Sequence, residues 1–344
     1  MTYKAHFEKK TFLFKHPSGT SRGVLTEKHA WFLSLQDSNG FTGIGECSII
    51  PGLSPDFIDF VSYESKVDEV CQNINYFVDN QVELRLFPSV LFGVEQAVLA
   101  LNAKRKNTEG IFYNTPFTRG EKGMPINGLI WMGSSQFMLD QIEEKLATGF
   151  SCLKMKIGAI DFEEELNILR HIRNRFSIHE IELRVDANGA FKPQEALEKL
   201  IRLSEFGIHS IEQPIAPGQF DEMKSLCSQT PIPIALDEEL IGVNGTNAKS
   251  NLLTYINPQY IILKPSLHGG IVGSTEWILE AEKWSIPWWI TSALESNVGL
   301  NTIAQFASSF ENELPQGLGT GGLYVNNTPS SMRICNGFIW NNFT

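Results

Sequence analysis

The sequence has few cysteines, an excess of acidic over basic residues, and no long apolar run. Its five cysteines are scattered and show no CxxC spacing, so we expect neither a disulfide framework nor a zinc site. Asp and Glu number 39 against 28 Lys and Arg, which gives a formal net charge of −11 at pH 7. No basic tract offsets this charge, and we therefore expect no nucleic-acid or anionic-membrane partner.

Targeting and nucleotide-binding motifs are also missing. No apolar run reaches the roughly 18 residues of a membrane span, and the N-terminal text MTYKAHFEKKTF lacks an apolar signal segment. The cytoplasm is therefore the expected location. No GxGxxG or P-loop sequence follows any apolar run, which weakens the case for a doubly wound, nucleotide-binding fold.

The composition favours a large folded core in more than one domain. The 344 residues are 42% hydrophobic and 19% charged, a balance that is typical of globular proteins. Residues 1–118 resemble an α+β module, with alternating strands that turn near Asn39-Gly40 and helical patterns at about 56–80 and 88–104.

From Met124 onward, short apolar runs alternate with helical patterns, which predicts parallel strands covered by helices. We expect an α/β fold with a (β/α)7β TIM-like barrel at 119–322, capped by an α+β domain that combines 1–118 with the tail 323–344. The expected strands are 124–131, 152–157, 181–186, 208–212, 232–237, 260–264 and 287–292, with an eighth near 316–320.

Five charged residues stand at the ends of consecutive predicted strands: Lys156, Asp186, Glu212, Asp237 and Lys264. The gaps between them match one βα unit each, and the C-terminal ends of barrel strands converge on one site. Each acid alone would also suit a helix cap or a turn, but five in register favour a shared site.

These residue types indicate a metal-assisted reaction of a carboxylate substrate. Three carboxylates suit a hard cation, Mg²⁺ first with Mn²⁺ as a substitute, because histidine and thiol ligands are missing. A cation of this kind stabilises the charge that develops when a proton α to a carboxylate is removed. Lysine can be the base where positive charge nearby lowers its pKa, and Lys154 lies two residues from Lys156. His268 is interpreted as structural.

The motifs that carry these residues resemble the enolase superfamily. They are KMKIG, VDANGAF, IEQP, ALDEE, LKPSLHGG, SALES and GLGTG in the barrel, with GIGECSIIPGLS and FGVEQAVLAL in the N-terminal module. Within the superfamily they resemble the muconate-lactonizing-enzyme subgroup, most closely its family of o-succinylbenzoate synthases. The resemblance covers nearly the whole chain.

The resemblance implies a role for each site residue. Lys156 would be the catalytic acid/base and Lys264 would face the substrate from the opposite side. The implied metal ligands are Asp186, Glu212 and Asp237. The implied substrate contacts are Lys154 and Asn188, the cap-loop residues Pro51, Gly52 and Leu53, and, after strand seven, Ser292, Glu295 and Ser296.

The implied reaction is a lyase reaction of menaquinone biosynthesis. It dehydrates 2-succinyl-6-hydroxy-2,4-cyclohexadiene-1-carboxylate to o-succinylbenzoate through a metal-stabilised enediolate. An N-succinylamino acid racemase or a dipeptide epimerase would use the same two lysines, although SALES and GLGTGG replace the D-x-D pair usual in dipeptide epimerases. A non-catalytic binding protein with this fold would have lost at least one of the five charges. No oligomeric state is predicted.

Overall fold

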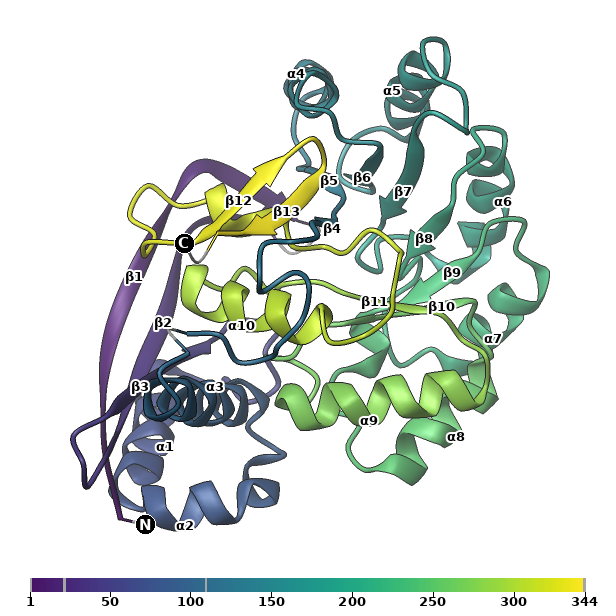
Figure 1. The fold of residues 1–344 in the computed structure, drawn as a ribbon. Coiled ribbons are helices and arrows are strands. Elements are labelled where there is room, and N and C mark those ends of the chain that lie inside the picture. The colour runs from purple at the N-terminus through teal and green to yellow at the C-terminus, as the bar shows by residue number, and fades with distance from the viewer. Residues whose placement is uncertain (1, 21–22, 109, 343–344) are drawn as a thin grey trace.

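The computed structural model describes residues 2–20, 23–108 and 110–342 of the chain. Its N-terminal unit is an antiparallel sheet with the strand order β1-β2-β3, packed against helices (Figure 1). The elements of this unit are β1 (Tyr3–Thr20), β2 (Gly23–Asp37), β3 (Thr42–Ser48), α1 (Phe60–Gln72), α2 (Ile74–Asp79), η1 (Gln81–Leu84) and α3 (Pro88–Arg105).

Helix α3 lies so close to β3 that glycine is required at the crossing. A Cβ atom at Gly45 would overlap the carbonyl oxygen of Gly93, and one at Gly93 would overlap Sγ of Cys47. The helix expected at 88–104 is therefore both present and tightly seated on the sheet.

The helical pattern expected at about 56–80 forms two helices, α1 and α2, because the chain breaks at Asn73. Asp59 caps the first half by accepting a hydrogen bond from the backbone N–H of Ser62. The Asn73 side-chain amide then donates to the carbonyl of Glu69 at 2.9 Å, which ends α1 before α2 begins.

The second unit is a parallel barrel whose strands follow one another around the sheet in the order β5 to β11. Its helices lie on the outside (Figure 1). The elements are β5 (Gly128–Ile130), α4 (Ser135–Ala147), β6 (Cys152–Lys156), α5 (Phe162–Arg173), β7 (Glu182–Asp186), α6 (Pro193–Ser204), β8 (Ser210–Glu212), α7 (Phe220–Gln229), β9 (Ile234–Leu236), η2 (Glu238–Leu240), α8 (Thr246–Ile256), β10 (Tyr260–Leu263), α9 (Gly270–Lys283), β11 (Trp288–Ile290), α10 (Asn297–Ala307) and η3 (Gly319–Gly322).

Residues 316–317 close the barrel at the place where an eighth strand was expected. Gln316 makes a parallel bridge to Ile126, and Gly317 makes one to Thr291. Gly317 N donates to the carbonyl of Ile290 at 2.9 Å, so the segment joins the first and last strands. Within the described residues this confirms the expected (β/α)7β barrel with a capping unit.

The C-terminal tail contacts both units. Tyr324 bridges Phe14 of β1, whereas the hairpin of β12 (Met332–Cys335) and β13 (Phe338–Asn341) pairs with β4 (Met124–Pro125) at the entry to the barrel. The first part of the tail therefore contacts β1, and its hairpin contacts β4.

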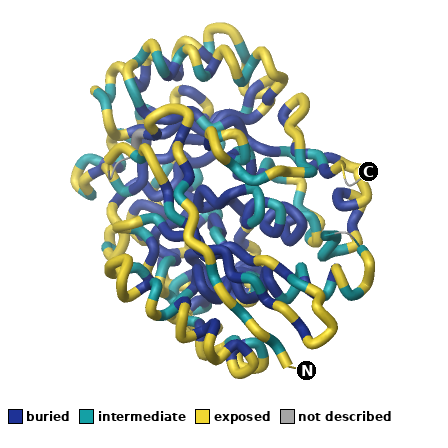
Figure 2. Tube along the Cα trace, turned by 90° about the vertical axis from the view of Figure 1, so that its left-hand side faces the viewer, coloured by how far each residue is buried: buried dark blue, intermediate teal, exposed yellow. Residues whose placement is uncertain are grey.

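The barrel strands form the main core of the molecule. Buried positions run along the strands and the inner faces of the helices, and exposed positions lie on the outer turns (Figure 2). Among the described residues, no helix combines the length and apolarity that crossing a membrane requires.

Candidate active site

The charged residues predicted from strand ends meet at one mouth of the barrel because their strands run parallel and in register. Lys156 pairs with Asp186 across β6 and β7, and Asp186 pairs with Glu212 across β7 and β8. Asp237 directly follows β9 and Lys264 directly follows β10. The side chains therefore converge at the C-terminal ends of consecutive strands, as in other parallel barrels.

Lysine and carboxylate side chains alternate across this mouth. Lys154 Nζ lies 3.0 Å from Asp186 Oδ2 and also binds Glu212. On the other side, Lys264 Nζ binds Asp237 and lies 3.7 Å from Glu212 Oε1. Glu212 thus stands between two ammonium groups that reach the site from different sides of the barrel.

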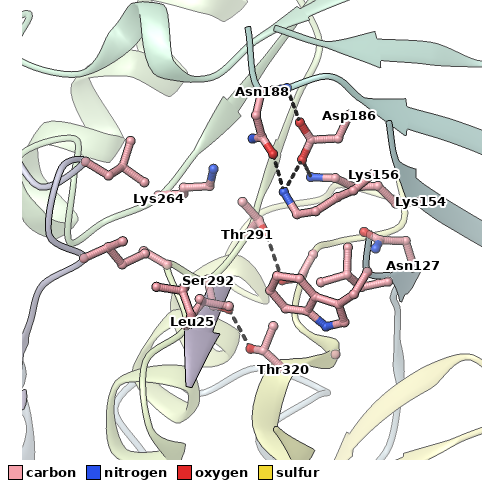
Figure 3. Close-up of a pocket in the computed structure, with 18 of the residues that line it drawn as sticks. Leu25, Asn127, Lys154, Lys156, Asp186, Asn188, Lys264, Thr291, Ser292 and Thr320 are labelled. Carbon is pink, nitrogen blue, oxygen red and sulfur yellow. Dashed lines mark hydrogen bonds and ion pairs between the residues drawn. The ribbon is translucent and has the colours of Figure 1, made fainter. Parts of the chain in front are cut away.

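Lys156 lines the cavity, and two neighbouring side chains hold its ammonium group. Its Nζ donates to Asp186 Oδ2 at 2.9 Å and to Asn188 Oδ1 at 2.6 Å, and it lies 5.9 Å from the centre of the Trp131 ring. Lys264 reaches toward it from the far side of the cavity (Figure 3). A substrate between these two lysines would present opposite faces to them.

Burial and the neighbouring charges shift the pKa values of these residues. Burial opposes the charged forms of Lys154 and Lys264, but the nearby carboxylates outweigh it and raise both pKa values. Burial likewise opposes ionisation of Asp186, but Lys154 and Lys156 hold the pKa of that carboxyl well below its usual range. Burial raises the pKa of Asp237.

The acidic residues fit a hard divalent cation by their chemistry. Two of their buried oxygens, Glu212 Oε1 and Asp237 Oδ1, accept no hydrogen bond from the described residues. A buried carboxylate oxygen without such a partner is costly, and a cation would satisfy both. Within the described part of the chain, no three acidic, histidine or cysteine side chains already stand in ligand geometry. The ammonium group of Lys154 separates Asp186 from Glu212.

A cavity of about 210 Å³ opens in front of the lysines. Its walls come from both units, so the capping unit completes a site that the barrel begins. The lining residues are Gly23, Val24, Leu25, Ile50, Pro51 and Leu53 from the capping unit, and Asn127, Leu129, Trp131, Lys154, Lys156, Asp186, Asn188, Lys264, Thr291, Ser292, Ala293, Leu294, Gly317, Gly319 and Thr320 from the barrel.

Most of the residues predicted from the sequence line this cavity, and the others do not. Glu212 and Asp237 stand behind the lysines that they bind. Gly52 is exposed between two lining residues.

Glu295 and Ser296, predicted as substrate contacts, are buried outside the lining. Glu295 accepts a hydrogen bond from Ser266, while Ser296 begins α10 and donates its backbone N–H to Glu46 at 2.8 Å. Their partners are protein groups because the chain turns away from the cavity at Leu294.

Several lining residues were not predicted from the sequence. Asn127, Thr291 and Thr320 bring amide and hydroxyl groups to the cavity, and Trp131 brings an aromatic ring. Thr291 does follow a barrel strand, so its position was a usable signal. Leu25 lies on a capping strand, whose place over the barrel follows from tertiary packing alone.

The chain belongs to the enolase C-terminal domain-like family, whose model matches residues 138–340. The whole chain is also 44% identical to an o-succinylbenzoate synthase of Desulfotalea psychrophila, with 97% of each sequence covered. These two matches confirm the resemblance inferred from the strand-end motifs.

Solved structures agree with the fold. The crystal structure of MenC from Desulfotalea psychrophila matches with a TM-score of 0.81 at 41% identity, covering 98% of this chain and 99% of that one. A dipeptide epimerase from Enterococcus faecalis, complexed with Mg and the dipeptide L-Leu-L-Tyr, matches with a TM-score of 0.83 at 17% identity. It covers 99% of this chain and 98% of that one, and it supports the fold alone.

Proposed function

We propose that this chain is an o-succinylbenzoate synthase, a lyase that dehydrates 2-succinyl-6-hydroxy-2,4-cyclohexadiene-1-carboxylate to o-succinylbenzoate. The main support is the identity of 44% to such an enzyme over nearly the full chain. The cavity agrees with this activity, because lysines stand on two sides of it beside three buried carboxylates.

Lys156 is proposed as the residue that moves the protons. Its Nζ takes the proton α to the substrate carboxylate. The electron pair of that C–H bond forms the new ring double bond as the C–O bond of the neighbouring carbon breaks. Lys156 returns the proton to the departing hydroxyl, so that water leaves and the ring becomes aromatic. Asn188 and Asp186 hold Nζ of Lys156 toward the cavity.

The remaining charged residues are proposed to bind the metal ion and to orient the substrate. Asp186, Glu212 and Asp237 are the proposed ligands of Mg²⁺, with Mn²⁺ as a substitute. When bound, such a cation supplies charge neutralisation for the substrate carboxylate. Lys264 approaches the ring from the side opposite Lys156. We also propose that the protein is located in the cytoplasm. Its proposed partner is a small-molecule carboxylate, the substrate.

The test follows ultraviolet absorbance as the purified protein meets the cyclohexadiene substrate, with Mg²⁺ and then with EDTA. Mg²⁺-dependent formation of o-succinylbenzoate is expected, and Lys156→Ala should lower kcat by about 10²- to 10⁴-fold, the usual share of a general acid/base. Lys122→Met, at an exposed position outside the cavity, is the matched control.

Absence of turnover by the folded, Mg²⁺-supplied wild type would refute the proposal. Exchange of the α-proton in N-succinylamino acids or dipeptides would then identify the racemase or epimerase alternative, in which Lys264 is the second base.

A further inference from the structure

The loop after β11 forms one wall of the cavity and carries a strained backbone. Thr291, Ser292, Ala293 and Leu294 all line the cavity. Leu294 has a φ of 62°, a left-handed conformation that is costly for a residue other than glycine. The loop therefore needs partners that hold this turn.

Lys28, on β2 of the capping unit, supplies the main partner. Its side chain is buried, and its ammonium group donates to the carbonyl oxygens of Ala293 and Leu294, the latter at 2.8 Å. The hydroxyl of Tyr324 donates to the same Leu294 oxygen at 2.6 Å. Hydrogen bonds from a charged donor are stronger than neutral ones, and their loss would leave buried carbonyls unpaired.

The next residues of the same segment are held by the neighbouring strand of the cap. Glu46, on β3, accepts hydrogen bonds from Ser296 Oγ at 2.6 Å and from Gly299 N at 2.9 Å. The start of β2, residues 23–25, lines the cavity as well. Strand β2 therefore has two contacts with the site: residues 23–25 line the cavity, and Lys28 holds the loop that forms one of its walls.

We propose that Lys28 is a positioning residue for the substrate: by fixing the carbonyls of Ala293 and Leu294, it fixes the wall that presents Ser292 to the cavity. Ser292 Oγ lies 2.6 Å from Thr320 Oγ1, so the loop and the segment after the eighth strand share this wall. Lys28 does not line the cavity and acts through the loop. The inference rests on the proposed function, since it assigns Lys28 to that site.

The charge on Lys28 is sensitive to pH. Burial lowers the pKa of Lys28 to about 8, although Glu295 and Glu46 oppose this shift. Burial raises the pKa of Glu46 and of Tyr324, which also faces these acids. Lys28 should therefore lose its proton in mildly alkaline solution, where arginine at this position would stay charged.

The experiment compares wild type, Lys28→Met, Lys28→Arg and the exposed control Lys122→Met in turnover of the cyclohexadiene substrate with Mg²⁺. Lys28→Met should raise KM about tenfold with kcat little changed, the factor expected for a lost hydrogen bond to a charged group. Lys28→Arg should restore most of the wild-type KM. In wild type, KM should rise above about pH 8, while in Lys28→Arg it should stay flat.

Amide hydrogen exchange gives a second readout that needs no turnover. Exchange in residues 291–299 should rise in Lys28→Met and should return toward wild type in Lys28→Arg. Tyr324→Phe keeps the ammonium group and removes one donor, so it should cause smaller changes in the same direction. Lys28→Gln removes the charge but keeps an amide donor, and this variant decides whether Lys28 holds the loop if Lys28→Met fails to fold.

An unchanged KM, or unchanged exchange in residues 291–299, in a folded Lys28→Met protein would overturn the inference. Where folded Lys28→Met cannot be obtained, an unchanged KM or unchanged exchange in residues 291–299 of Lys28→Gln would overturn it. A wild type without turnover would refute the proposed function instead, and the exchange comparison would still decide whether Lys28 holds the loop.

Discussion

At the scale of single residues, the site is a set of charges that neutralise one another in a buried place. Lys154 lies between Asp186 and Glu212, and Lys264 binds Asp237. Removing one member leaves a charge without its partner, which costs more than a surface ion pair contributes. A substitution of one of these buried charged residues should therefore alter cation binding more than a substitution of an exposed charged residue does.

At the residue scale, the prediction concerns metal binding by Asp186. Asp186→Asn removes a negative charge but keeps an oxygen that can accept from Asn188 N, which now donates to Asp186 Oδ1 at 3.0 Å. We expect Mg²⁺ affinity, measured by titration calorimetry, to fall by at least about tenfold, because Mg²⁺ sites depend on carboxylate charge. The exposed Asp140→Asn should bind as wild type does. Equal Mg²⁺ affinity in both variants would refute Asp186 as a ligand.

The charged residues could be predicted from the sequence because each ends an apolar strand, and parallel strands bring such ends together. Among the neutral lining residues, Asn188 and Ser292 were predicted from the family resemblance. Asn127, Thr291 and Thr320 were not, since amide and hydroxyl side chains occur in every loop. Glu295 is predicted as a substrate contact because it follows strand seven, and in the structure its side chain accepts a hydrogen bond from Ser266. Lys28 lies far from the barrel in sequence, and only the packing of the cap brings it to the loop.

At the scale of elements, the barrel strands and α3 follow the apolar periodicity, but local hydrogen bonds decide where helices end. Asn73 divides one expected helix into two. The tail hairpin pairs with β4, a contact between segments about 200 residues apart that no local pattern encodes. The close approach of α3 to β3 could not be predicted either, because a glycine in a strand can have several structural reasons.

Gly45→Ala tests the packing of α3 on β3. The added methyl group would overlap the Gly93 carbonyl, which belongs to the helix backbone and cannot rotate away. Overpacking costs about 1–3 kcal/mol, and we expect thermal unfolding to begin several degrees lower. Gly322→Ala, where a Cβ atom meets open space, is the matched control. Similar melting temperatures in both variants would show that the helix can shift without cost.

At the scale of the whole molecule, two buried acids of the cap join it to the barrel at the start of two helices. Glu46 accepts hydrogen bonds from the first turn of α10, and Glu95, on α3, accepts from Ile271 N and from Val272 N at 2.9 Å on α9. Carboxylates at helix N-termini are favoured by the unpaired N–H groups there. The cavity lies between the units that these acids hold together, so the same contacts support the site.

Glu95 makes this junction dependent on pH. Burial raises the pKa of Glu95 from 4.5 to about 8, although the bonds from Val272 and Ile271 oppose the rise. Between these two values the unfolded chain has released a proton that the folded chain retains. The stability contributed by Glu95 is therefore fully present below about pH 4.5 and is lost as the pH rises through about 8.

Glu95→Gln should flatten that dependence, because the amide does not ionise and its oxygen can still accept one N–H. In urea unfolding from about pH 5 to pH 9, we expect the wild-type free energy of unfolding to fall more than that of the variant, by on the order of a few kcal/mol. Glu144→Gln, at an exposed position of α4, should keep the wild-type slope. A Glu95→Gln slope equal to that of wild type would mean that Glu95 is ionised throughout this range, held by the N-terminus of α9 more strongly than burial opposes it.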